Sequence, residues 1–165
     1  MPYPASAHPE DLALLLENHR IWVASDGTHG ERADLRDLDL VGRSFWRTDL
    51  RQALLDRSNL AGANLDHADL REASLQDARL ASASLWEAKL NKADLRGADL
   101  HDAKLDHADL RGADLTGANM DGVSLKSALL NEFGAAGRSR SRYQPRLLIH
   151  EDFSYNPLKG NAFST

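Results

Sequence analysis

The sequence predicts a solenoid, a rod in which a short repeated unit winds into successive coils. An apolar residue returns at every fifth position from Leu35 to Leu130, giving twenty positions without a gap, which we call the ladder. All ladder residues are leucine except Phe45 and Met120. Alanine stands two residues before the ladder residue in fifteen repeats, and the exceptions are Leu38, Arg43, Thr48, Ser58 and Val123. Such fixed-period similarity is typical of units that bury their apolar faces against one another.

A period of five fits neither a straight helix nor a straight strand. On an α-helix each residue advances by about 100°, so a five-residue step scatters the leucines around the cylinder. On a strand, an odd step sends alternate leucines to opposite faces. A chain that turns a corner once per repeat keeps the leucine and the preceding alanine pointing inward. The ladder therefore predicts a corner in every repeat.

Individual repeats carry a recognisable motif. Residues 63–67 read Ala-Asn-Leu-Asp-His, residues 93–97 Ala-Asp-Leu-Arg-Gly and residues 113–117 Ala-Asp-Leu-Thr-Gly. They resemble the A(D/N)LXX unit of the pentapeptide-repeat family, and the resemblance covers residues 31–130, about three fifths of the chain. It implies an all-β solenoid, a right-handed quadrilateral β-helix of about five coils with twenty residues per coil. Asp-His-Ala-Asp-Leu-Arg at 66–71 returns at 106–111, two such coils later.

The segment before the ladder predicts a capping helix. Residues 1–8 are rich in proline and alanine, and we expect them to be frayed. A helix from Pro9 to residue 24 would place one apolar stripe on the first coil, made of Leu12, Leu15, Leu16, His19, Trp22 and Val23. Residues 9–30 are thus predicted to be an N-terminal capping α-helix and linker that cover the open end of the rod. A ligand site at His19 and Trp22 is the alternative, and packing is favoured.

Arg43 is the unusual residue of the inward register. Burying an unpaired charge is costly, so we expect Arg43 to reach the end of the coil or to pair with an acidic group or helix carbonyls. A fully buried Arg43 without a polar partner would contradict this.

One outward face is the candidate partner-binding surface. With twenty residues per coil, residues twenty apart stack at about 4.8 Å. One column then reads Trp46, Asp66, Trp86, Asp106 and Lys126, beside Arg47, His67, Glu87, His107 and Ser127. Exposed aromatic residues are enriched at binding surfaces. We define the tryptophan face by its candidate residues, which are Trp46, Asp66, His67, Trp86, Asp106 and His107. In the alternative, each tryptophan lies flat on its neighbours and only covers backbone.

The sequence offers little for catalysis, metals or small molecules. There is no cysteine, no phosphate-binding glycine loop and no nucleophile elbow. Carboxylates recur on every face and do not converge on one reacting atom, so we expect no enzyme, no cofactor and no small-molecule substrate. His67 and His107 would lie about 10 Å apart, too far to share a metal ion. Repeated Asp–Arg pairs are interpreted as a solvated salt-bridge network, with a docking strip as the alternative.

Residues 131–165 leave the period and are predicted to form a C-terminal tail. A basic loop at 134–142 carries Arg138, Arg140 and Arg142, which is weak evidence for nucleic-acid binding. The apolar segment that follows could pack on the last coil or on a partner, and a homo-oligomer could form through this end. No apolar run approaches the roughly 18 residues needed to span a bilayer, and the N-terminus lacks the basic n-region and apolar h-region of a secretory signal. We therefore expect a cytoplasmic protein without membrane contact.

Two functions are compatible with the sequence. The first is a non-catalytic interaction or scaffold module with an unknown protein partner. The second follows from the resemblance alone, because some pentapeptide-repeat proteins mimic duplex DNA and bind DNA gyrase or topoisomerase IV, conferring quinolone or toxin resistance. Residues 31–130 hold 18 acidic and 14 basic residues, a net charge of −4. Duplex DNA of the expected rod length, roughly 24 Å, carries about 14 phosphate charges. The charge therefore favours the first function.

Overall fold

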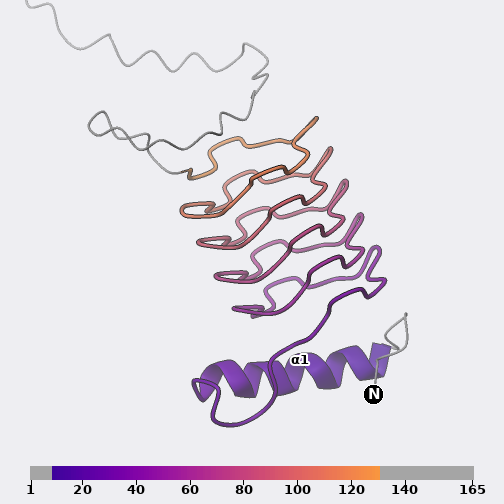
Figure 1. Ribbon diagram of the computed structural model, residues 1–165, viewed down its shortest axis with the longest axis vertical. Coiled ribbons are helices and arrows are strands. Elements are labelled where there is room, and N and C mark those ends of the chain that lie inside the picture. The colour runs from indigo at the N-terminus through magenta and orange to yellow at the C-terminus, as the bar shows by residue number, and fades with distance from the viewer. Residues whose placement is uncertain (1–8, 131–165) are drawn as a thin grey trace, which may run out of the picture. The chain divides into compact units, whose positions relative to one another are not determined.

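A helix is followed along the chain by a stack of backbone coils (Figure 1). The computed structural model describes residues 9–130. Helix α1 spans Pro9–Ala24, sixteen residues, and no other helix or extended strand occurs in that range. Nor is any helix of residues 9–130 long and apolar enough to cross a membrane. The predictions for the frayed residues 1–8 and for the tail at 131–165, including its basic loop and oligomer contact, lie outside the described residues.

Parallel bridges between residues twenty apart hold the coils together. The residue before each ladder position pairs with its counterpart in the next coil, as Asp34 does with Leu54, and sixteen such bridges occur in the described range. Neighbouring coils exchange backbone hydrogen bonds in both directions, such as Leu35 N to Leu54 O at 2.7 Å and Leu54 N to Ala33 O at 2.9 Å. This confirms the twenty-residue register. The β-structure consists of single bridges because a side of five residues leaves no room for longer pairing before the next corner.

Every corner places one residue in the left-handed backbone region. It is the second residue after the ladder position, and all nineteen such residues from 37 to 127 have φ between +53° and +78°. Glycine reaches this region without steric cost, yet it occupies only six of these positions, and thirteen carry a side chain. The alanine N–H that follows closes the turn on the ladder carbonyl three residues earlier, as in Ala53 N to Leu50 O at 3.0 Å.

The ladder side chains fill the inside of the coils. From Leu35 to Leu110 every ladder residue is at most 2% exposed. Ser58, which replaces an alanine, is also buried, and its hydroxyl donates to the Leu55 carbonyl at 2.7 Å. A buried hydroxyl without such an acceptor would destabilise the core. From Ala113 to Ala128 the inward residues are only partly buried, and the last ladder residue, Leu130, is exposed.

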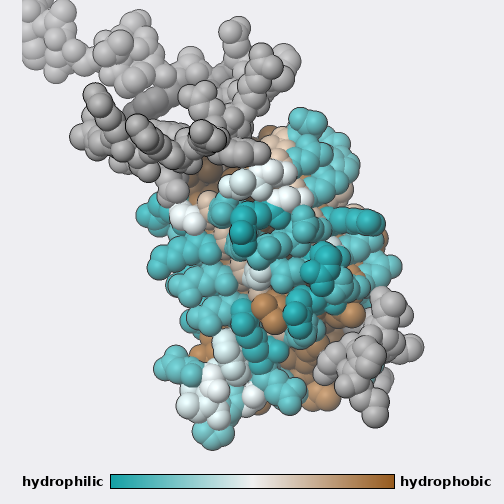
Figure 2. Space-filling model, viewed as in Figure 1, coloured by the Kyte–Doolittle hydropathy of each residue, from teal (hydrophilic) through white to brown (hydrophobic). Residues whose placement is uncertain are grey.

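Polar side chains cover most of the outer surface in view. Figure 2 shows hydrophilic residues along the coils, with apolar side chains visible between them.

Arg43, the unusual inward residue, is half-buried. It therefore avoids the full enclosure that would contradict the prediction.

Helix α1 lies across the first end of the stack (Figure 1). Leu12 is 7% exposed and belongs to the core, while Leu15 and Leu16 pack against it. The linker approaches the helix closely at Gly30, where φ is +75° and an added Cβ would lie 2.4 Å from the Asn18 carbonyl oxygen. Both the backbone conformation and the close approach therefore require glycine at this position.

Candidate functional site

The tryptophan face is built around Trp86, whose ring lies between two histidine rings. His67 comes from the preceding coil and His107 from the following one. The ring centroid of Trp86 is 4.8 Å from that of His67, at an interplanar angle of 89°, and 6.0 Å from that of His107, at 75°. Edge-to-face contacts of this kind stabilise aromatic pairs. Trp86 nevertheless remains 40% exposed, so the histidines hold the indole in place without covering it.

The backbone explains why these three rings meet. His67 and His107 occupy corner positions, with φ of +58° and +61°. The N–H of His67 donates to the Trp86 carbonyl at 2.8 Å, which fixes the distance between their coils. His67 Nδ1 also lies 3.3 Å from Glu87 Oε2, a contact that becomes an ion pair when the imidazole is protonated.

Trp46 lies two coils before Trp86 and is 53% exposed. The guanidinium of Arg47 lies 4.6 Å from the centroid of the Trp46 ring, a cation–π arrangement. Both tryptophans thus contact neighbouring side chains, while Trp46 is 53% and Trp86 is 40% exposed. Of the residues singled out from the sequence, His67, Trp86 and His107 form one cluster, and Trp46 stands apart from it.

The two aspartates of the face act within the rod. Asp66 Oδ1 accepts hydrogen bonds from the Trp86 N–H at 3.0 Å and from the Ser84 hydroxyl at 2.5 Å. Asp106 Oδ1, two coils later, accepts the same two bonds, from the Lys126 N–H at 3.2 Å and from the Ser124 hydroxyl at 2.7 Å. Each carboxylate therefore links its own coil to the next one. Sequence reasoning missed this role, although a serine eighteen residues after the aspartate signals it.

Asp–Arg pairs occupy other faces of the rod. Arg51, Arg71 and Arg111 each contact the aspartate two residues earlier, with nitrogen–oxygen distances of 2.6–2.7 Å. Hydrogen bonds from Arg111 hold the pKa of Asp109 far below its ordinary value. Arg36 and Arg96 make the same contact with Asp34 and Asp94, and their hydrogen bonds lower the pKa of both carboxyls. These contacts agree with the interpretation of the pairs as a salt-bridge network.

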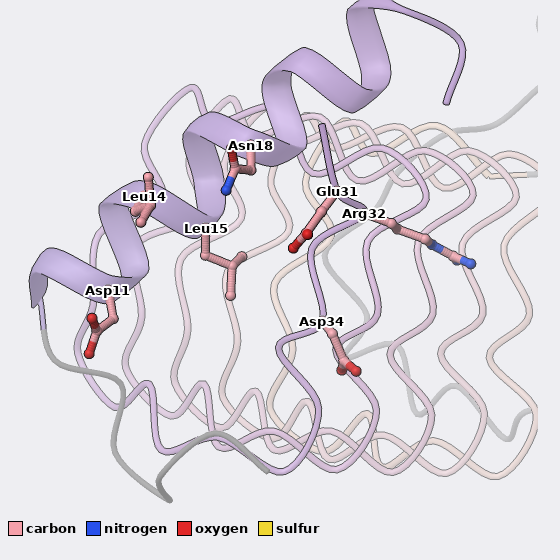
Figure 3. A pocket seen from close by; sticks show the side chains of 7 residues that line it. All are labelled: Asp11, Leu14, Leu15, Asn18, Glu31, Arg32 and Asp34. Carbon is pink, nitrogen blue, oxygen red and sulfur yellow. The ribbon is translucent and has the colours of Figure 1, made fainter. Parts of the chain in front are cut away.

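A shallow hollow of about 170 Å³ lies between α1 and the first coil (Figure 3). Leu14 and Leu15 of α1 line it together with charged residues of the linker and first coil, including Glu31, Arg32 and Asp34. The lining of this hollow therefore combines acidic, basic and apolar side chains.

Within residues 9–130, no three histidine or carboxylate side chains are grouped so that they could hold a metal ion.

A family model for pentapeptide repeats, in eight copies, matches residues 33–72, 58–97, 73–112 and 93–131. These overlapping matches cover more than half of the chain. The chain belongs to the pentapeptide-repeat family. The match confirms the family assigned from the sequence. The right-handed β-helix of this family fits the twenty-residue register of the bridges.

Solved pentapeptide-repeat structures resemble parts of the chain. HetL, involved in heterocyst differentiation regulation in the cyanobacterium Nostoc sp. strain PCC 7120, is 31% identical; the match covers 60% of this chain and 64% of HetL, with a TM-score of 0.42. A protein of the Arabidopsis thaliana thylakoid lumen is 33% identical, with coverages of 58% and 60% and a TM-score of 0.32. For trypsin-treated QnrB1, a plasmid-mediated fluoroquinolone resistance protein, the identity is 19%, the coverages are 63% and 65%, and the TM-score is 0.41.

The chain spans less than two thirds of the length of each of these proteins. Comparison with curated proteins gave no match. Membership of the family therefore rests on the repeat match, and the family's fold is the property that carries over directly.

Proposed function

We propose that this protein is a non-catalytic interaction module, a right-handed rod of about five coils capped at its first end by α1, that binds a protein partner through the tryptophan face. The observation that carries this proposal is the position of Trp86, held between His67 and His107 while 40% of it stays exposed. Large aromatic side chains contribute most to binding when they are buried at the centre of an interface.

Pre-organisation of the indole supports the same function. A side chain that is free in the unbound protein loses about 0.5–1.5 kcal/mol of conformational entropy when a partner immobilises it. The two histidine rings already restrict Trp86, and the Arg47 guanidinium restricts Trp46. A partner that covers this face gains apolar contact at a reduced entropic cost.

DNA mimicry toward gyrase or topoisomerase IV has weaker support. A DNA mimic needs a dense array of unpaired negative charge, whereas residues 31–130 carry a net charge of −4. Many of the carboxylates also pair with arginine, as Asp69 does with Arg71 at 2.6 Å. The negative charge that a DNA-binding enzyme such as gyrase would contact is therefore largely neutralised on the faces that carry these pairs.

Affinity capture from the source cell, quantified by mass spectrometry, tests the proposed surface. The baits are the wild-type chain, the double variant Trp46→Ala/Trp86→Ala and the control Val41→Ala. Val41 is a suitable control because it is 53% exposed, as Trp46 is, but lies on the neighbouring side of the coil. Matched circular dichroism spectra and melting curves establish that the three baits are equally folded.

The proposal requires a partner that wild type and Val41→Ala retain and the tryptophan double variant loses. Equal recovery by all three baits refutes the tryptophan face as the binding surface. A supercoiling assay with purified DNA gyrase addresses the other function: inhibition, or protection from a quinolone, at micromolar protein would favour DNA mimicry instead.

A further inference from the structure

His19 connects the capping helix to the start of the rod. Its side chain is fully buried, and its ring stacks on Trp22 with a centroid distance of 5.7 Å and an interplanar angle of 14°. The Nδ1 atom of His19 accepts a hydrogen bond from the backbone N–H of Ala33 at 3.0 Å. The imidazole is therefore a polar contact between α1 and the first coil, in addition to the apolar packing of Leu12.

This hydrogen bond replaces one that the first coil cannot make for itself. In later coils the alanine N–H donates to the ladder carbonyl three residues earlier, as Ala53 does to Leu50 at 3.0 Å and Ala73 to Leu70 at 3.1 Å. Ala33 opens the first coil, and no ladder residue precedes it. Its N–H would be buried without an acceptor, which is costly. His19 Nδ1 takes the place of the missing carbonyl.

We propose that His19 is a proton-operated latch, which holds α1 on the first coil only while its imidazole is neutral. A neutral imidazole with its proton on Nε2 presents Nδ1 as an acceptor. Protonation turns Nδ1 into a donor that faces the donor N–H of Ala33, so the bond is lost. It also places a positive charge in a fully buried position, where an unpaired charge is strongly unfavourable.

The surroundings of the ring favour its neutral form. Nε2 is buried and makes no hydrogen bond of good geometry with the described residues. Burial is the main cause that lowers the pKa of His19, and the guanidiniums of Arg32 and Arg51 act in the same direction. The carboxylate of Asp49 and the carbonyl of Arg51 oppose them without reversing the shift.

The sign of the pH dependence follows from this direction. Because the pKa of His19 is lower in the folded protein than in the unfolded chain, the unfolded chain binds the proton more tightly. The docked helix is therefore most stable above the ordinary imidazole value, about pH 6.5, and loses stability as the pH falls below it. Release of α1 uncovers the apolar stripe at Leu12, Leu15 and Leu16 together with the inward side of the first coil.

Hydrogen exchange of the intact chain tests the latch. The protection factors of the α1 amides and of Ala33 are compared between about pH 7.5 and pH 5.5, after correction for the intrinsic exchange rates. In wild type they should fall with decreasing pH, by up to about tenfold per pH unit. The variant His19→Gln keeps a carbonyl acceptor that does not titrate, so its α1 protection should not follow the pH.

His101→Gln is the matched control, because His101 is a partly exposed histidine whose pKa is raised by its hydrogen bond to Asp99. Its α1 protection should follow the pH as in wild type. A direct NMR titration of His19 in wild type covers the case in which His19→Gln fails to dock. The latch is overturned by α1 protection in wild type that does not follow the pH, or by a His19 pKa at or above its ordinary value.

Discussion

Replacing the corner glycine Gly42 with alanine isolates the cost of the left-handed backbone at the turns of the rod. Gly42 has φ of +64°, and an added Cβ would meet no atom within 4 Å. The substitution therefore creates no clash, and only the backbone conformation opposes it. Ser82 offers the reverse change, because it stands at the same corner two coils later with φ of +56°.

The size of the effect follows from two opposing contributions. A side chain in the left-handed region costs about 1–2 kcal/mol. Alanine in place of glycine restricts the unfolded chain, which favours the variant by about 0.4–1 kcal/mol. The difference predicts that Gly42→Ala lowers the free energy of unfolding by about 0.8 kcal/mol and that Ser82→Gly raises it by a similar amount. The melting temperature would move by about 3 °C in each direction.

Urea unfolding followed by circular dichroism measures both changes. The two corners are separated by two coils, or about 10 Å, so the double variant Gly42→Ala/Ser82→Gly should return close to the stability of wild type. If Gly42→Ala is as stable as wild type, or if Ser82→Gly is less stable than wild type, the left-handed backbone at the corners does not decide the stability of the turns.

Three further changes test other parts of the rod. Gly30→Ala should cost more than Gly42→Ala, above about 2 kcal/mol in the same urea assay, because its Cβ would also collide with the Asn18 carbonyl. Leu75→Ala should lower the unfolding free energy by about 2–5 kcal/mol, because Leu75 is fully buried and its loss leaves a cavity. The pKa of Asp109 is lowered by Arg111, so its contribution to stability disappears as the pH falls below the ordinary carboxyl value, about 4. The melting temperature of wild type should therefore decline over this pH range, and the decline should be smaller in Asp109→Asn.

The ladder could be predicted because its period constrains every repeat in the same way. A five-residue step excludes the regular helix and strand, and the twenty-residue register then follows from the resemblance and agrees with the bridges. The bond between His19 and Ala33 could not be predicted in this way. It depends on where the linker places the first coil beneath α1, which is a tertiary relation that no local pattern records.

The aspartates of the tryptophan face illustrate a different gap. Their column could be placed from the period alone, but a column says only that side chains point outward. Whether Asp66 faces solvent or turns back to the Trp86 N–H depends on its rotamer and on the serine in the next coil. The aromatic rings show the same gap. The spacing of the coils predicts that His67 lies near Trp86, but the edge-to-face contact depends on side-chain torsions that the sequence does not give.

The corner residues help to distinguish a binding surface from outward side chains that have no role in binding. Arg47, His67 and His107 all stand in the left-handed region, although glycine serves at six other corners and the fold does not require a side chain there. Backbone strain does not by itself mark a site, since ten more corners carry side chains in the same conformation. These three differ in that each holds its side chain against an exposed tryptophan. Glycine at these corners would relieve strain but remove the contacts that position the indoles, and this opposition is expected where a surface is kept for binding at some expense of stability.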